Sequence, residues 1–142
     1  MFVLKHQDGE IRFALAKGGF SLSNEKLCIS IETDHVDGES FPDRFLFALE
    51  DFPVQSRSGI EEIEVVGNTE GETPNVFVYT TFHSDEVTAR LVVEWLGEIR
   101  MKVQLSVISD DVKFYDDRAK PNQFTGECEL SICGREVLWV PV

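Results

Sequence analysis

The sequence contains few basic residues: 13 Lys and Arg stand against 26 Asp and Glu, and the formal net charge of the 142-residue chain is −13. Surfaces that bind nucleic acids need clustered Lys and Arg side chains, so this composition argues against nucleic-acid binding. It argues equally against attachment to an anionic membrane surface. Apolar runs are also short, since none approaches the roughly 20 residues of a membrane-spanning helix. We therefore expect neither a nucleic-acid partner nor membrane insertion.

Cysteine is scarce as well. Cys28, Cys128 and Cys133 are an odd number and contain no CxxC spacing, which argues against a disulfide framework and a structural zinc site. We expect them to be buried, unreactive thiols. The N-terminus, MFVLKHQD, is too short and too polar for a signal peptide, so we expect a cytoplasmic protein. The chain length predicts a single domain over residues 1–142.

Alternation of apolar and polar residues is the dominant pattern in the chain. It is clearest from Ile99 to Val107, where every second residue is apolar, and this predicts a half-buried strand. Turn sequences that contain glycine separate this run from shorter alternations. Together they predict a mainly β fold, an antiparallel β-sandwich or strongly curved sheet of about eight strands. The shorter alternations lie at residues 11–15, 27–31, 76–82 and 128–132.

The segment 84–97 is compatible with two structures. Ser84 could cap a helix that Gly97 ends, with charged residues four positions apart between them. The same segment also alternates between apolar and polar residues, which is typical of a strand. We favour the strand, and an α+β fold with residues 84–96 helical remains the alternative.

The strand interpretation predicts a pairing register. A three-residue loop at residues 96–98 would place Trp95 opposite Ile99 and Glu94 opposite Arg100, which keeps the apolar face intact. A four-residue loop at residues 83–86 would pair the other side of the strand with residues 76–82, so that Val78 lies opposite Leu91.

One short helix is expected near residue 45. Ser40 can cap it, Pro42 fits its first turn, and Pro53 ends it. The aromatic and aliphatic residues between them recur at helical spacing and would share one face; they are Phe41, Phe45, Leu49 and Phe52. A strand through Phe45, Phe47 and Leu49 is the alternative.

The sequence offers little for catalysis. It has three histidines, His6, His35 and His83, and none belongs to a nucleophile or metalloprotease motif. With 26 acidic residues, a pair of carboxylates could perform glycosidase-type chemistry, but the sequence does not indicate which pair. We expect a non-enzymatic protein without a cofactor, and a carboxylate-based enzyme with an unlocated site remains an alternative.

Two short stretches resemble C2 domains. The run FYDDRAKPNQFTGE at residues 114–127 is similar to the third calcium loop of that family, and GESFP at residues 38–42 is similar to its first loop. The resemblance implies a β-sandwich with degenerate calcium loops, for which Asp116 and Asp117 are the candidate metal ligands. Only Asp117 matches an Asp ligand position of the family; the other positions carry His35, Phe41, Tyr115 and Gln123.

An acidic span is the feature that points to a function. From Ser58 to Ala89 there is no Lys or Arg, whereas seven Asp and Glu residues fall there. Such a field can steer a basic protein toward the surface, and small acidic immunity or inhibitor proteins are analogous in charge and size. Solubility alone is the competing explanation for the charge. The partner-binding residues that we predict are Glu70, Glu72, Phe77, Tyr79 and Glu86.

Overall fold

Strands account for all the regular structure in the described part of the chain. The computed structural model describes residues 1–6, 9–36, 44–55, 57–80, 83–109 and 123–133. Within these ranges there is no helix, which confirms the mainly β prediction. The strands are β1 (Phe2–His6), β2 (Gly9–Ser23), β3 (Lys26–His35), β4 (Arg44–Pro53), β5 (Ile60–Val66), β6 (Asn75–Tyr79), β7 (His83–Ser84), β8 (Val87–Trp95), β9 (Arg100–Ser109) and β10 (Gln123–Ser131).

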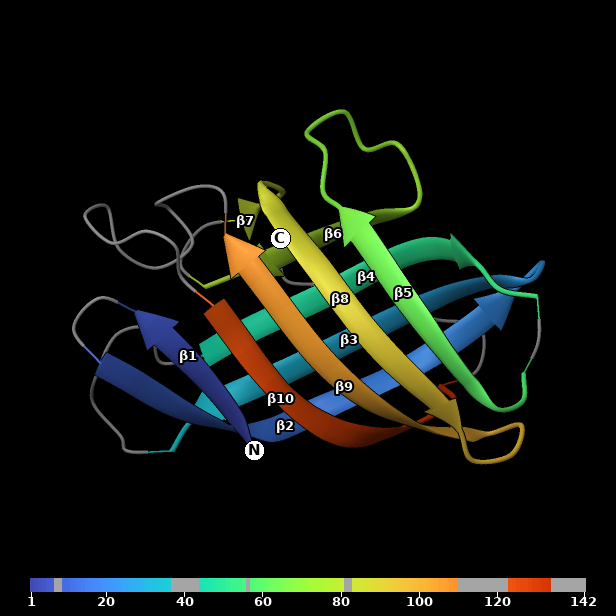
Figure 1. The fold of residues 1–142 in the computed structure, drawn as a ribbon, viewed down its shortest axis with the longest axis horizontal. Coiled ribbons are helices and arrows are strands. Elements are labelled where there is room, and N and C mark those ends of the chain that lie inside the picture. The colour runs from blue at the N-terminus through green and yellow to red at the C-terminus, as the bar shows by residue number, and fades with distance from the viewer. Residues whose placement is uncertain (7–8, 37–43, 56, 81–82, 110–122, 134–142) are drawn as a thin grey trace.

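All ten described strands belong to one sheet, in the order β5-β8-β9-β10-β1-β2-β3-β4-β6-β7, and neighbouring strands are antiparallel. The sheet curves strongly, so that β5, β8, β9, β10 and β1 form a front layer and β2, β3, β4 and β6 cross behind it (Figure 1). Antiparallel strands that bury one face alternate apolar and polar residues, which is the pattern that the sequence shows. The pairing of β1 with β10, which is not a hairpin between strands adjacent in sequence, joins the strands β5, β8, β9 and β10 to the strands β1 to β4 in this one sheet.

Aromatic rings fill the space between the layers. Phe124 of β10 stacks on Phe45 of β4 with ring centroids 3.8 Å apart, and on Phe2 of β1 at 5.4 Å. Phe13 of β2 meets Phe124 edge-on at 5.8 Å. All four side chains are fully buried. Four strands from distant parts of the sequence therefore meet at one ring.

The expected helix near residue 45 is wrong, because residues 44–53 form β4. Phe45, Phe47 and Leu49 point into the core, as the alternative strand predicted, while Leu46 and Ala48 are buried on the opposite face. A strand that is buried on both faces lacks the apolar–polar alternation that identifies half-buried strands. Residues four and eight positions apart share a face in a strand as well as in a helix, so the spacing could not separate the two.

The segment 84–97 is a strand as predicted, but its register is different. Trp95 lies opposite Met101 and Glu94 opposite Lys102, two residues beyond the predicted partners. The hydrogen bond from the Leu96 N–H to the Arg100 oxygen places the loop at residues 97–99. A shift of two residues leaves every side chain on its own face, which is why the hydrophobic pattern could not exclude it.

The predicted pairing of β8 with β6 is also wrong. The second neighbour of β8 is β5, with Ile63 opposite Leu91, and β6 pairs with β4 and β7. Strand β5 was not predicted from the sequence, because its alternation of apolar and polar residues is short. Strands β6 and β7 also separate β5 from β8 along the chain, so the pairing of β5 with β8 is not a simple hairpin.

No disulfide joins the cysteines among the described residues, and Cys28, Cys128 and Cys133 are half-buried and not fully buried as expected. The Cys28 Sγ lies 3.3 Å from the Asp51 carboxylate, and the Cys133 Sγ lies 3.1 Å from the Phe20 carbonyl oxygen. Burial raises the pKa of the Cys128 thiol to about 11. Within the described ranges there is also no helix of the length and hydropathy needed to cross a membrane.

Phe124→Ala should lower the free energy of unfolding by about 3–5 kcal/mol, because it leaves a cavity between three other rings. Phe124→Leu should cost less. Urea unfolding followed by circular dichroism measures both variants against Ile99→Ala, an exposed position where about 0.5 kcal/mol or less is expected. Equal losses for Phe124→Ala and Ile99→Ala would contradict the central place of this ring.

Cys128 should resist alkylation in the folded protein. At pH 8 a thiol with a pKa of about 11 is ionised to about one part in a thousand, whereas an ordinary cysteine is ionised to about one part in four. We expect iodoacetamide to label Cys128 at least about 100-fold more slowly in the folded chain than in urea, as measured by peptide mass spectrometry. Labelling of Cys128 at the same rate in both states would show that the thiol is not protected.

Candidate partner-binding site

The acidic span of the sequence places its carboxylates on three segments: β5, the loop 67–74 above it and the residues just before β8 (Figure 1). We call its acidic residues the acidic corner; they are Glu61, Glu62, Glu64, Glu70, Glu72, Asp85 and Glu86. Glu61 is half-buried at the start of β5, and this burial raises the pKa of its carboxyl group.

Gly67 brings three segments of the corner together. Its N–H donates to the Val87 oxygen at 2.8 Å, and a Cβ at this position would lie 2.8 Å from the Val76 oxygen and closer still to the Asp85 oxygen. Only glycine permits this approach, because a side chain would force the backbones apart. Glu86 therefore lies beside the base of the loop that carries Glu70 and Glu72.

Two asparagines fix the shape of that loop. The Asn68 side chain donates to the Glu72 oxygen at 2.8 Å and accepts from the Glu72 N–H at 2.9 Å. The buried Asn75 side chain accepts from the Asn68 N–H at 2.9 Å. Glu70 and Glu72 are exposed on this hydrogen-bonded loop. The structure thus brings three of the predicted residues, Glu70, Glu72 and Glu86, to one region, and the two asparagines that hold the loop were not recognised in the sequence beyond the turn at 67–68.

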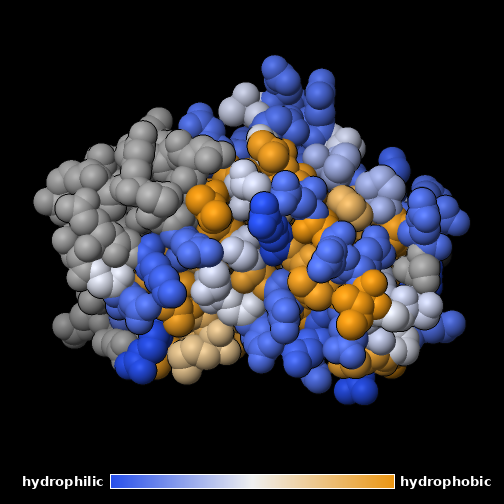
Figure 2. All heavy atoms as spheres, in the orientation of Figure 1, coloured by the Kyte–Doolittle hydropathy of each residue, from blue (hydrophilic) through white to orange (hydrophobic). Residues whose placement is uncertain are grey.

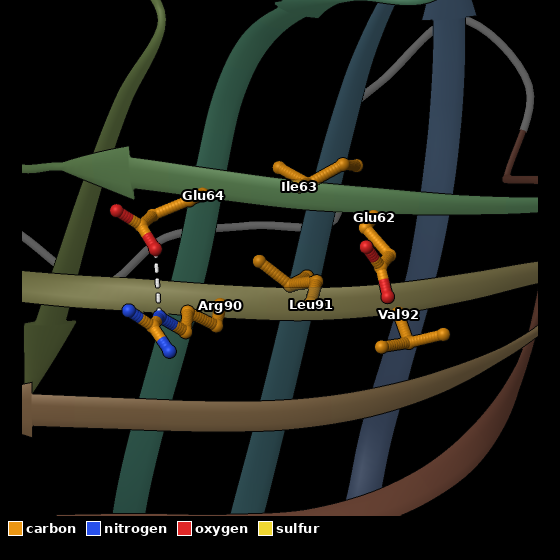
Figure 3. Close-up of a pocket in the computed structure, with 6 residues that line it drawn as sticks. All are labelled: Glu62, Ile63, Glu64, Arg90, Leu91 and Val92. Atoms are coloured by element: carbon orange, nitrogen blue, oxygen red, sulfur yellow. Dashed lines mark ion pairs between the residues drawn. The ribbon is translucent and has the colours of Figure 1, made fainter.

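An open depression of about 390 Å³ lies over β5 and β8 (Figure 3). Arg90 reaches across the strands to Glu64, with a nitrogen–oxygen distance of 2.6 Å. Glu62 lies opposite Val92, and no ion pair joins it to another described residue. The depression can therefore accept hydrogen bonds or a cation at Glu62 and offers apolar contact at Val92, and its lining contains no Ser, Thr, Cys or His.

Phe77 and Tyr79 lie apart from the carboxylates of the depression. They form a small cluster with Leu46 and Ala48 on the outer face of β4 and β6. Phe77 is 8 % exposed, so it has little area left to offer, whereas Tyr79 is half-buried. The apolar residues that are exposed beside the acids are instead Ile60 and Val66, at the two ends of β5.

The candidate metal ligands and His35 are the remaining candidates from the sequence. Among the described residues no three His, Cys, Asp or Glu side chains are placed to hold a metal ion. Asp116 and Asp117 lie outside the described residues, as do the loop at 38–42 and most of the run 114–127. The His35 ring packs edge-on against Phe13 at 5.6 Å, which accounts for its position.

Comparisons of the chain with protein-family models, curated proteins and solved structures gave no match. Function therefore has to be inferred from the acidic corner itself. Figure 2 shows that this side of the molecule is largely hydrophilic, with separate hydrophobic patches between the charged residues.

The Glu64–Arg90 ion pair should give a measurable coupling energy. Both side chains are more than half exposed, and exposed pairs of this kind contribute about 0.2–1 kcal/mol. A double-mutant cycle with Glu64→Gln and Arg90→Gln, measured by urea unfolding, should show this coupling. The matched cycle with Glu94→Gln and Arg100→Gln should show a smaller coupling, because these residues are diagonal neighbours and not directly opposite each other; a coupling there as large as that of Glu64 with Arg90 would favour the register predicted from the sequence.

Proposed function

We propose that this chain is a small non-enzymatic binding protein that docks a basic protein partner through the acidic corner, as immunity and inhibitor proteins do. One observation carries the proposal: a span with seven carboxylates and no Lys or Arg folds so that Gly67 joins the hydrogen-bonded loop of Glu70 and Glu72, directly after β5, to the residues around Glu86. Arg90 neutralises one of them, Glu64, and the Glu70 and Glu72 carboxylates project from the loop.

The carboxylates act mainly on the rate of association with the partner. A field of one sign raises the association rate of an oppositely charged partner by about 10- to 1,000-fold, and exposed charges are screened beyond about 8 Å at physiological ionic strength. Retention needs apolar contact in addition, because rim charges mainly affect association. Ile60 and Val66 supply exposed apolar area next to the carboxylates, and Tyr79 is a further predicted contact.

The proposal places this encounter in the cytoplasm. Support comes from the three cysteines, which are too few and too irregularly spaced for a secreted disulfide scaffold.

The variant Glu70→Gln/Glu72→Gln/Glu86→Gln tests the proposal. The wild-type chain serves as bait in an extract of the source cells, and the recovered protein is then purified for surface plasmon resonance at about 50 to 500 mM salt. We expect the triple variant to associate about tenfold more slowly at low salt, with a weaker dependence on salt. Tyr79→Ala should instead raise the dissociation rate.

The matched control is Glu10→Gln/Glu25→Gln/Glu98→Gln, which removes the same charge from exposed residues at the start of β2, between β2 and β3, and between β8 and β9. It should associate nearly as fast as the wild-type chain. Equal effects of the two triple variants, or an association rate that is insensitive to salt, would leave the net charge as a solubility property and contradict the proposal.

A further inference from the structure

Strand β5 is the first strand in the sheet order and pairs with β8 alone among the described strands. It forms the right-hand boundary of the front layer in Figure 1. An edge strand presents backbone N–H and C=O groups without partners, which is a template for another strand. The strand that carries three residues of the acidic corner is therefore also an open edge of the sheet.

The hydrogen bonds to β8 show which backbone groups face outward. The Trp95 N–H donates to the Gly59 oxygen at 3.0 Å, and the Gly67 N–H donates to the Val87 oxygen at 2.8 Å. In an antiparallel pair, hydrogen-bonded and non-hydrogen-bonded residues alternate. The odd-numbered residues from 59 to 67 thus bond to β8, whereas the even-numbered residues direct their N–H and C=O groups to the open edge; these are Ile60, Glu62, Glu64 and Val66.

The same four residues share the outer face of the sheet, because Ile63 and Val65 point into the core. Ile60 and Val66 are 68 % and 61 % exposed, and the two glutamates lie between them. The edge thus presents the order apolar, acidic, acidic, apolar at every second residue. Cross-strand neighbours on one face contact each other, so this order specifies the side chains of a strand that would pair here.

A second copy of the chain is a poor occupant of this edge. Every two-fold pairing of β5 with itself that uses three or more of the outward residues places two glutamates opposite each other: Glu62 with Glu64, Glu62 with Glu62, or Glu64 with Glu64. Directly opposed like charges destabilise a strand pair, and two chains of net charge −13 also repel at longer range. Charge complementarity favours a basic strand instead.

We infer that the open edge of β5 accepts an extended basic segment of the partner protein as an additional strand. Lys or Arg at every second residue would lie opposite Glu62 and Glu64, and apolar residues would lie opposite Ile60 and Val66. The inferred direction is antiparallel, which all the neighbouring strand pairs of this sheet have; the lysines then direct their own N–H and C=O groups toward Glu62 and Glu64. This inference rests on the proposed function and names the manner in which the partner binds.

Synthetic peptides test the inference with the full chain. The probe is the capped peptide Val-Thr-Lys-Thr-Lys-Thr-Val, with binding followed by isothermal titration at low salt and by amide hydrogen exchange. We expect the N–H groups of Ile60, Glu62, Glu64 and Val66 to become protected. The N–H groups of Ile63 and Val65, which already bond to β8, should change little.

Backbone methylation separates strand addition from attraction between charges. N-methylation of the two lysines removes the donors that would face β5 and should abolish binding, whereas N-methylation of the threonines on the other edge should preserve it. In the protein, Glu62→Pro removes one outward N–H without breaking the β8 ladder and should weaken binding at least about tenfold. Glu62→Gln keeps that N–H and should weaken binding about two- to fivefold.

Three results would overturn the inference. Equal binding of the lysine-methylated and unmodified peptides would show that the peptide binds by charge attraction and does not add a strand, and the proposed function would stand. Absence of binding by the unmodified peptide at low salt would exclude the edge, and the association kinetics of the Glu70, Glu72 and Glu86 variant would then decide the proposed function separately. Protection of the four amides with rising protein concentration and no peptide would assign the edge to a second copy.

Discussion

The contact between the two layers of the sheet depends on the ring of Phe124. It stacks on Phe2 and Phe45 and meets Phe13 edge-on, so β1, β2, β4 and β10 share one buried group. Gly126, two residues later on β10, leaves room for Phe2, since a Cβ there would overlap the Phe2 ring and would lie 2.6 Å from the Met1 oxygen. Stacked and edge-on aromatic pairs of this kind contribute to stability beyond the area that they bury.

This core decides the geometry of the acidic corner. Ile63 and Val65 hold the inner face of β5 in the same hydrophobic cluster, so the outward residues belong to a strand with little freedom to move. The loop above it is held by Asn68 and Asn75, and Gly67 ties it to the residues before β8. A partner would therefore meet carboxylates whose backbone positions are already ordered, and it would lose less conformational entropy on binding than with a mobile acidic tail.

The strands that bury one face could be predicted from the sequence alone, because the alternation of apolar and polar residues in strands such as β8 and β9 reflects burial of one face directly. It failed at β4, where Leu46 and Ala48 are buried on the second face and remove the alternation. The register of β8 with β9 was off by two residues, since Trp95 packs on the same face opposite Ile99 or Met101. The acidic span was visible as composition, but its sheet edge was not, because pairing of β5 with β8 joins segments that are separated along the chain.

The pairing of β1 with β10 joins Phe2 to Gly126, almost the whole sequence apart. Such non-local contacts slow folding, because a large loop must close before the contact stabilises the chain. During synthesis, strands β1 to β4 emerge long before Phe124 and expose Phe2, Phe13 and Phe45 to solvent until β10 is made. Exposed apolar surface of this kind favours aggregation between nascent chains. Mutual repulsion between nascent chains that are rich in acidic residues opposes it, so the acidity also serves the unfinished protein.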